Sequence, residues 1–255
     1  MKEFWTQIQE NLVFLSNMKE LWTQIQENLV FLGISVGIVV ILFLASAGAE
    51  RLLPARRKVS PARRVSIVAV CAAIATVLHV LDFPLLFLAP EFYKVDFSEL
   101  PVLLCGFFLG PSSAVACEAV KILLKLLLKG TSTAFVGDFA NFVVGCSLVI
   151  PASLVYHTHK TKKTALLGLA LGCFIMTVFG SIFNAVYLLP KFSQLYGIPL
   201  DAIIAMGTKI NGSIHNLTTL VVLAVAPLNL IKSVTVSILT MLLYKRVARP
   251  LFRAD

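Results

Sequence analysis

The sequence predicts an all-α integral membrane protein, in which a bundle of six transmembrane helices follows one extra N-terminal transmembrane helix. Three observations lead to this prediction: the composition, the lengths of the apolar runs and the positions of the basic residues. Of the 255 residues, 58% are hydrophobic and 14% are charged, whereas soluble domains carry about 25% charged residues. No soluble stretch is long enough to bury a core of its own, so the chain divides into membrane spans rather than soluble domains.

Seven apolar runs account for the predicted helices, and most of them approach the roughly 20 residues that a helix needs to cross a bilayer. In chain order they are 29–48, 65–83, 99–110, 112–128, 139–156, 165–190 and 222–244. The third run is short, and the turn signal Gly110-Pro111 separates it from the fourth. We therefore expect a short or tilted helix that is joined tightly to its successor. The segment 191–221 has room for a further short helix.

The N-terminal part of the chain differs in character from the rest. The stretch MKEFWTQIQENLVFL (1–15) returns almost unchanged as MKELWTQIQENLVFL (18–32). A repeat fold needs several stacked units, so we interpret this match as a recent duplication or a misassigned start. An amphipathic segment at the membrane surface is the other interpretation. We divide the chain into residues 1–64, with the duplication, the extra helix and a basic linker, and residues 65–248, a six-helix membrane domain.

Basic residues cluster beside the apolar runs, in 51–64, in 157–163 and in the tail from residue 245. The positive-inside rule places such segments in the cytoplasm, and six crossings from residue 65 onward satisfy it for all three. The chain is thus predicted to be a multi-pass protein of the cell membrane, with the core N-terminus and the C-terminus cytoplasmic. These clusters also explain the formal charge of +9, so lipid is expected around the chain and nucleic-acid binding is not. The outer segments are 84–98, 129–138 and 191–221.

Polar residues interrupt the last two apolar runs. Asn229 and Lys232 lie one helical turn apart and share a face, although a lysine at the centre of a span costs about 2.5–3.5 kcal/mol. Asn184 lies in the preceding helix, and the predicted topology puts both amides in the outer half of the membrane. Intramembrane polar residues mark substrate sites by default, but a single asparagine often only joins helices together. A shared outward-facing pocket and a packing role therefore both remain open.

Other polar groups are assigned structural roles. Asp96 and Glu99 in DFSELP have the spacing of a capping box, so we interpret them as a helix cap rather than as ligand contacts. Glu118 is expected to form an ion pair with Lys121 or Lys125. His79 is expected to form a hydrogen bond within the bundle, because no metal-ligand cluster accompanies it.

Several sequence features that would indicate an enzyme are missing. The chain has no G-x-x-x-x-G-K-[ST] phosphate loop and no convincing nucleophile motif. All five cysteines lie in apolar runs, where free cysteine behaves as a small hydrophobe. We therefore predict no catalytic residues, no metal and no enzyme activity.

Four stretches carry a resemblance to a known family: FYKVDFSELPVLLCGFFLGPSSAVACEAVKILL, GDFANFVVG, MTVFGSIFNAVYLLP and APLNLIKS. Together they resemble the riboflavin-specific S components of energy-coupling factor (ECF) transporters, from about residue 65 to residue 248. The resemblance implies a membrane subunit that binds extracellular riboflavin as a transported ligand and uses no cofactor. It also implies association with a transmembrane coupling (T) subunit and two cytoplasmic ATPase subunits.

The resemblance also implies residue roles. Asn184, Asn229 and Lys232 match positions that hold the polar edges of the flavin, and Phe92 with Tyr93 matches a loop that gates the pocket. Such a pocket is expected to be mostly apolar with a few convergent polar groups. The expected ligand-binding residues are Asn141, Asn184, Asn229, Lys232, Phe92 and Tyr93.

The first core helix carries the small pair Ala69 and Ala73, whose spacing permits close approach by another helix. The resemblance implies that this pair is the contact face for the coupling subunit. Two alternatives remain: an S component for a different vitamin, and a membrane partner protein without a transport function. A membrane enzyme is disfavoured, because it would need a nucleophile–base pair or a metal cluster.

Overall fold

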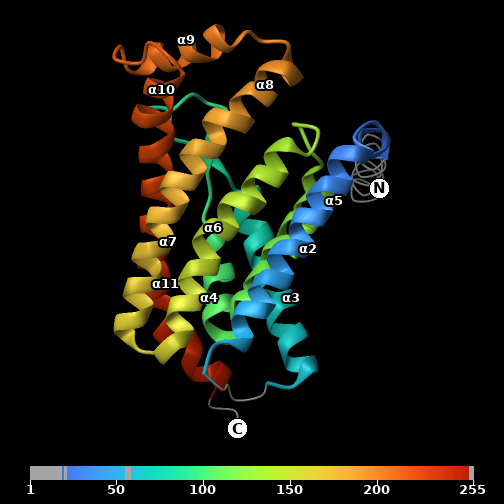
Figure 1. Ribbon diagram of the computed structural model, residues 1–255, viewed down its shortest axis with the longest axis vertical. Coiled ribbons are helices and arrows are strands. Elements are labelled where there is room, and N and C mark those ends of the chain that lie inside the picture. Colours follow the sequence, from blue (N-terminus) through green and yellow to red (C-terminus); the bar gives the residue numbers. More distant parts are fainter. Residues whose placement is uncertain (1–18, 20–21, 55–58, 253–255) are drawn as a thin grey trace, which may run out of the picture.

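The computed structural model describes residue 19 and residues 22–54 and 59–252. Within these residues the chain is almost entirely helical, and most helices run along the long axis of the molecule (Figure 1). Five of the described helices are long and apolar enough to cross a membrane. The fold is therefore an all-α membrane protein, as predicted. Most of the duplicated N-terminal segment lies outside the described residues.

The elements can be followed in Figure 1 by their labels. In chain order they are α2 (Leu29–Arg51), α3 (Pro61–Val80), β1 (Phe83–Pro84), β2 (Lys94–Val95), α4 (Glu99–Leu109), α5 (Pro111–Lys129), α6 (Val136–His159), α7 (Lys162–Phe183), η1 (Asn184–Leu188), α8 (Leu189–Tyr196), α9 (Leu200–Ile210), α10 (Leu217–Leu220), η2 (Val221–Val225) and α11 (Ala226–Phe252). The segments η1 and η2 are single turns of π-helix.

Local sequence explains where several helices begin and end. The Ser60 hydroxyl accepts a hydrogen bond from a backbone N–H in the first turn of α3, and Pro61 takes the first helical position, where its missing N–H is tolerated. Thr161 begins α7 with a capping box. Gly110 has a φ of 107°, which favours glycine, and it leads directly from the short buried helix α4 into Pro111 of α5. The tight connection expected at this turn is therefore present.

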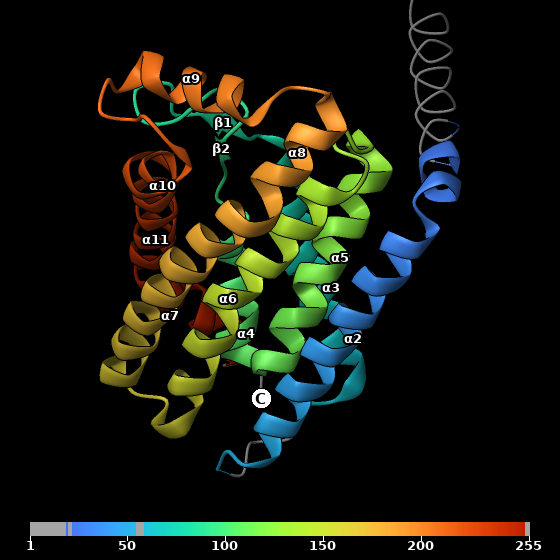
Figure 2. The same cartoon turned by 45° about the horizontal axis from the view of Figure 1, so that its top comes forward.

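The described helices form a six-membered bundle, with α2 as an addition at its side. The bundle consists of α3, α4, α5, α6, α7 continued by α8, and α10 continued by α11. The end of α2, the start of α3, the turn between α6 and α7 and the end of α11 all lie at the lower end in Figure 1. This basic end carries Arg51, Arg63, Lys162 and Arg246. The opposite, distal end carries the two strands, α8 and α9 (Figure 2).

The distal end differs from the sequence-based expectation in two respects. The helix of the sixth apolar run does not stop at Pro190, because the chain passes through the π-helical turn η1 and continues as α8 to Tyr196. Proline disrupts a regular α-helix by removing one hydrogen bond, and the change of hydrogen-bond register in η1 accommodates it. The segment 84–98 is not only a loop, since Pro84 and Lys94 pair in a short antiparallel ladder. The expected extra helix in 191–221 is α9.

The extra helix α2 packs along α5 on the outside of the bundle (Figure 2). A small polar cluster fixes its basic end. Glu50 accepts a hydrogen bond from the backbone N–H of Ser112 at 2.9 Å, and Arg64 donates to the hydroxyls of Ser112 and Ser113 at 2.7 and 2.8 Å. The start of α5 is therefore linked to both α2 and α3.

Candidate functional site

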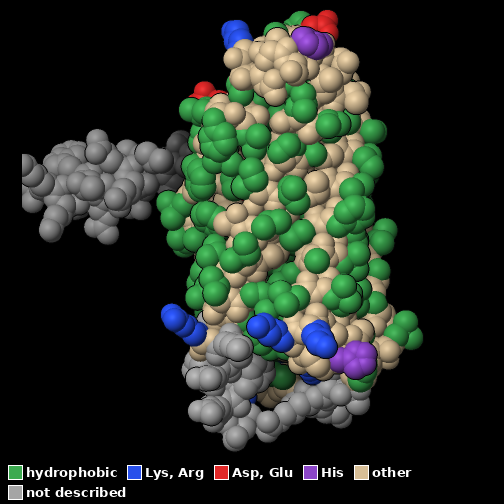
Figure 3. Space-filling model, turned by 90° about the vertical axis from the view of Figure 1, so that its left-hand side faces the viewer, with side chains coloured by type: hydrophobic (Ala, Val, Ile, Leu, Met, Phe, Trp, Pro, Cys, Tyr) green, Lys and Arg blue, Asp and Glu red, His purple; other side chains and the backbone are tan. Residues whose placement is uncertain are grey.

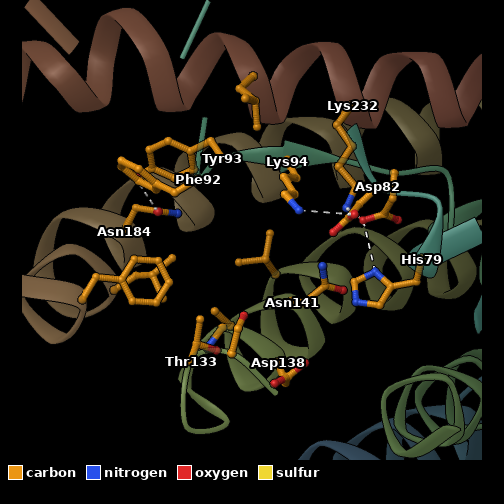
Figure 4. Close-up of a pocket in the computed structure, with 18 of the residues that line it drawn as sticks. His79, Asp82, Phe92, Tyr93, Lys94, Thr133, Asp138, Asn141, Asn184 and Lys232 are labelled. Atoms are coloured by element: carbon orange, nitrogen blue, oxygen red, sulfur yellow. Dashed lines mark hydrogen bonds and ion pairs between the residues drawn. The ribbon is translucent and has the colours of Figure 1, made fainter. Parts of the chain in front are cut away.

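A cavity of about 410 Å³ lies in the distal half of the bundle. Residues of α5, α6, α7, η1, α11 and the segment 84–98 line it. Figure 4 shows Phe92, Tyr93 and Asn184 on one side of the cavity, and Lys232, Asp82 and His79 on the other. Its volume falls within the range of about 300–1,000 Å³ that is usual for small-molecule sites.

Asn229 is buried in the wall of this cavity and has an incomplete set of hydrogen bonds. It lies in α11, close behind the π-helical turn η2, and such turns occur frequently at functional sites. Among the described residues, its amide nitrogen Nδ2 has no hydrogen-bond partner. A buried donor without a partner costs about 1–3 kcal/mol, so this amide is available to an acceptor on a bound molecule.

Asn184, by contrast, is held on both sides by the protein. It begins the π-helical turn η1, its Nδ2 donates to the carbonyl of Gly180 at 2.7 Å, and its Oδ1 accepts from the Tyr93 hydroxyl at 3.1 Å. Burial raises the pKa of Tyr93, so the hydroxyl stays protonated and remains a donor. Asn184 thereby links the segment 84–98 to the helix bundle.

Lys232 faces the cavity but already has two partners. Its ammonium donates to Asp96 Oδ2 and to Glu99, each at 3.1 Å. These two carboxylates offset the free-energy cost of placing a lysine in an apolar helix, since a buried charge is tolerated when it is paired. An ammonium has three N–H donors, so one of them is not used by these two hydrogen bonds.

The expected capping box at Asp96 and Glu99 is wrong. Ser98 precedes α4, and its side chain makes no cap hydrogen bond. Asp96 Oδ1 accepts instead from the backbone N–H of Ser98 at 2.8 Å, which is a local turn contact. Glu99 is buried and is paired with Lys121 as well as with Lys232. The two buried ammoniums need counter-charges inside the membrane more than the start of α4 needs a cap.

Lys232, Asp96 and Glu99 form a buried charge cluster, and a second lysine, Lys121, extends it. Lys121 donates to Ser98 Oγ at 3.0 Å and to Asn141 Oδ1 at 3.2 Å. It also forms the expected ion pair with Glu118. Asn141 therefore reaches the cavity, although its carbonyl oxygen is occupied by Lys121. In the described part of the chain, the cluster contains more carboxylates than lysines.

His79 completes the cluster on the side of α3. Its Nδ1 lies 3.2 Å from Asp96 Oδ2, which is the hydrogen bond within the bundle that the sequence predicts. Burial alone would raise the pKa of the Asp96 carboxyl, but Lys232 and His79 together hold it well below its usual range. Asp96 is therefore ionised, and it balances charge at the cavity wall.

Aromatic side chains cover the distal side of the cavity. The rings of Phe92 and Tyr93 lie 4.5 Å apart, and Phe92 meets Phe192 of α8 edge-on at 6.4 Å. All three line the cavity. Because Phe92 and Tyr93 come from the segment 84–98, movement of this segment would open or close the cavity.

Ala69 and Ala73 lie elsewhere. Both are exposed on the outer face of α3 and do not line the cavity. The structure thus brings together the six residues that the sequence singles out for a ligand, and it separates them from the small pair that is singled out for a partner.

Sequence reasoning missed two features of the site. The spacing of Asp96 and Glu99 predicts a cap, but these two carboxylates, at and just before the start of the buried helix α4, are the counter-charges that Lys232 requires. Gly180 was not singled out at all: a Cβ there would lie 2.8 Å from Nδ2 of Asn229. The glycine therefore leaves the space that the Asn229 amide occupies, and a single sequence contains no signal for this contact.

Comparison with known proteins places the chain in a family. The family model for the substrate-specific component of ECF transporters matches residues 63–244. The chain belongs to this family. It is therefore a component of a membrane transporter and not an enzyme.

Relatives with curated names agree with this assignment. The riboflavin transporter RibU of Staphylococcus aureus (strain TCH60) is 34% identical over 191 residues, which cover 75% of this chain and 93% of that protein. The riboflavin transporter FmnP of Bacillus subtilis (strain 168) is 29% identical over 183 residues, or 71% of this chain and 90% of that protein.

A solved structure of the S component of a bacterial ECF transporter is also similar. It is 32% identical in sequence and has a TM-score of 0.59, and the match covers 76% of this chain and 99% of that one. The family match begins at residue 63, so the extra helix α2 is an addition to the part of the chain that the family shares.

Proposed function

We propose that this ECF component captures riboflavin in the distal cavity for ATP-driven uptake. The single observation that carries the proposal is the Asn229 amide, which is buried in the cavity wall without a partner among the described residues. The riboflavin transporters RibU and FmnP, to which the chain is similar over most of their length, support the choice of ligand.

The chemistry of the cavity suits a flavin. An isoalloxazine ring has a broad apolar face and a uracil-like edge of alternating donors and acceptors. The apolar side chains of Val144, Met176 and Leu228 line the cavity together with the aromatic residues, and they provide surface for the ring. We assign the polar edge to Asn229, to the remaining donor of Lys232 and to the amide of Asn141, since amides supply both donors and acceptors.

Phe92 and Tyr93 are proposed as the gate. The hydrogen bond from Tyr93 to Asn184 holds the segment 84–98 over the cavity. Breaking that bond would free the aromatic side chains to move aside, so riboflavin enters and leaves at the distal end. We assign two roles to Asn184: it positions this gate, and it contacts the ligand.

The orientation follows from the basic end. Arg51, Arg63, Lys162 and Arg246 lie there, and the positive-inside rule places such residues in the cytoplasm. The distal cavity then opens to the exterior, and the core N-terminus and the C-terminus are cytoplasmic. Riboflavin captured outside would be released inside by the complete transporter.

A titration tests the ligand. We expect purified protein to quench riboflavin fluorescence with a stoichiometry near one and to show a higher apparent Tm in the presence of riboflavin, because a ligand that binds the folded state stabilises it. Biotin and thiamine, added under the same conditions, should change neither the riboflavin signal nor the Tm. A rise in the apparent Tm with another vitamin, together with no binding of riboflavin, would favour the alternative S-component assignment.

Gly180→Ala should weaken riboflavin binding. The added Cβ would lie 2.8 Å from Asn229 Nδ2, so the amide must leave its position and its hydrogen bond to the ligand is lost. We expect the Kd to rise about tenfold, as measured by fluorescence titration. Gly37→Ala in α2 is the matched control, because its Cβ would meet nothing within 4 Å. An unchanged Kd for Gly180→Ala would show that the Asn229 amide does not contact riboflavin.

The partners of the transporter are proposed to dock on α3. A transmembrane coupling subunit, associated with two cytoplasmic ATPase subunits, would pack against the exposed pair Ala69 and Ala73, because small residues allow close helix contact. Two residues that are buried on the same helix, Ala72 and Ala75, face the core of the bundle instead.

Replacing this pair should uncouple transport from binding. In the variant Ala69→Leu/Ala73→Leu we expect an unchanged riboflavin Kd, but at least a tenfold loss of coupling subunit recovered by co-purification, since close helix packing depends on small residues. The control is Ala205→Leu, which enlarges an exposed alanine on α9 at the distal end. Normal recovery of the coupling subunit with the double variant would move the docking face elsewhere.

A further inference from the structure

A second cavity lies at the basic end of the bundle. Figure 1 shows the two helices that line it, α7 and α11, on the side of the bundle opposite α2. It is a groove of about 760 Å³ between α7 and α11, which the turn between α6 and α7 closes at the basic end. This groove is larger than the distal cavity of about 410 Å³ and shares no lining residue with it. The proposed capture of riboflavin leaves it without a role.

The walls of the groove are apolar, and they lie on the side of the bundle that would face the lipid. On α7 they include Leu166 and Ala170, and on α11 they include Ile238 and Leu242. Leu166, Ile238 and Leu242 are each more than half exposed, as expected for side chains that contact lipid chains. In Figure 3 hydrophobic side chains cover this face along most of its height. The groove therefore opens laterally, at the depth of the bilayer, rather than into water.

Small side chains produce the hollow. Ala165 and Ala170 of α7 and Ser237 of α11 are among the residues that line the groove, and the buried side chains of Cys173 and Ser237 meet at its floor, with Sγ and Oγ 3.3 Å apart. Because these polar atoms satisfy each other, the floor offers no strong hydrogen-bonding group to a polar guest. The groove is suited to an extended hydrocarbon chain.

The basic end of the groove has the opposite character. Lys160 and Lys162 line it, together with Thr161, whereas no described lining residue is an aspartate or a glutamate. Lys and Arg side chains gather at this end of the face in Figure 3. Basic groups at the cytoplasmic membrane surface attract anionic lipids by about 1 kcal/mol each. An apolar groove that ends at lysines matches a molecule with a long hydrocarbon chain and a negative head.

We propose that this groove is a binding site for an anionic glycerophospholipid of the cytoplasmic leaflet. One acyl chain lies between α7 and α11, and the phosphate lies against Lys160 and Lys162. The lipid fills the space between the two helices that also carry Gly180 and Asn229, so it steadies the distal cavity from the opposite end. The site itself depends on the groove and its charges, and not on the identity of the vitamin.

Native mass spectrometry tests the proposal on the full chain in mild detergent. The probes are phosphatidylglycerol and, as a zwitterionic control, phosphatidylcholine with the same acyl chains. We expect phosphatidylglycerol adducts to survive at lower lipid concentration and to raise the apparent Tm. Lys162→Gln should weaken phosphatidylglycerol binding about fivefold, and Ala170→Trp should abolish it by filling the groove.

Matched controls separate the groove from the rest of the surface. Leu167→Trp enlarges a lipid-facing residue of α7 that does not line the groove, and Lys191→Gln removes an exposed lysine at the distal end. Both should bind phosphatidylglycerol as the unmodified chain does. Riboflavin titration shows that each variant is folded, and if Ala170→Trp fails this check, Lys162→Gln decides.

Three results would overturn the proposal. Equal binding of the two lipids would mean an annular lipid only. Undiminished phosphatidylglycerol binding in Lys162→Gln would place the head group elsewhere. The third result has two parts. The unmodified chain would bind no lipid but would show a mass corresponding to two copies, and Ala170→Trp would lose that mass. This would identify the groove as a protein interface.

Discussion

Asn229→Ala should bind riboflavin about 10- to 100-fold more weakly, because an acceptor on the ligand would lose the donor that it meets in the closed cavity. The stability of the ligand-free protein should change little, since Nδ2 of Asn229 has no partner among the described residues. The apparent Tm without ligand is therefore expected to change by no more than about 1–2 °C. Fluorescence titration and thermal unfolding in detergent measure the two quantities separately.

Two further variants control this result. Asn28→Ala replaces the residue before α2, which does not line the cavity, and should leave the Kd unchanged. Asn184→Ala should affect both quantities, because it also removes the acceptor for Tyr93 and the donor to Gly180. If Asn229→Ala lowered the Tm as strongly as Asn184→Ala while the Kd stayed normal, the amide would be a packing group.

The contrast between these two asparagines shows what a sequence reveals and what it leaves open. Both stand out as polar residues in apolar runs, and the predicted topology puts both in the outer half of the membrane. The pattern therefore indicates where a shared pocket could lie, but it leaves a pocket and a packing role equally open. It does not predict that Asn184 is satisfied by the protein while Asn229 is not, because this depends on which side chains face each helix.

The same limit explains the errors at the distal end. Hydrophobic runs fix the number and order of the spans, since every span must satisfy its backbone inside the membrane. They do not indicate the π-helical turns before Pro190 and Asn229, because a single inserted residue leaves the apolar pattern of a helix unchanged. Nor do they identify Lys232 as a partner of Asp96 and Glu99, because it lies more than 130 residues further along the chain.

Lys232→Met should be the most destabilising single change at the site. The substitution leaves Asp96 and Glu99 buried with one counter-charge fewer, and breaking a buried ion pair in this way costs about 3–5 kcal/mol. We expect a large fall in the apparent Tm and poor recovery of folded protein from the membrane. Size-exclusion chromatography and thermal unfolding in detergent provide the measurement.

A second substitution separates charge balance from ligand binding. In the double variant Lys232→Met/Glu99→Gln, a neutral amide replaces one of the two carboxylates that lost Lys232. Asp96 still has its hydrogen bonds to His79 and to the backbone N–H of Ser98. The Tm should therefore recover in large part. Glu99→Gln alone should have a small effect on the Tm, because Lys121 keeps its ion pair with Glu118.

The riboflavin Kd of the double variant should stay at least about tenfold above normal, since the third donor of the Lys232 ammonium is gone. If affinity recovered together with stability, Lys232 would act on the cavity only through its carboxylates, and the flavin edge would be left to Asn229 and Asn141.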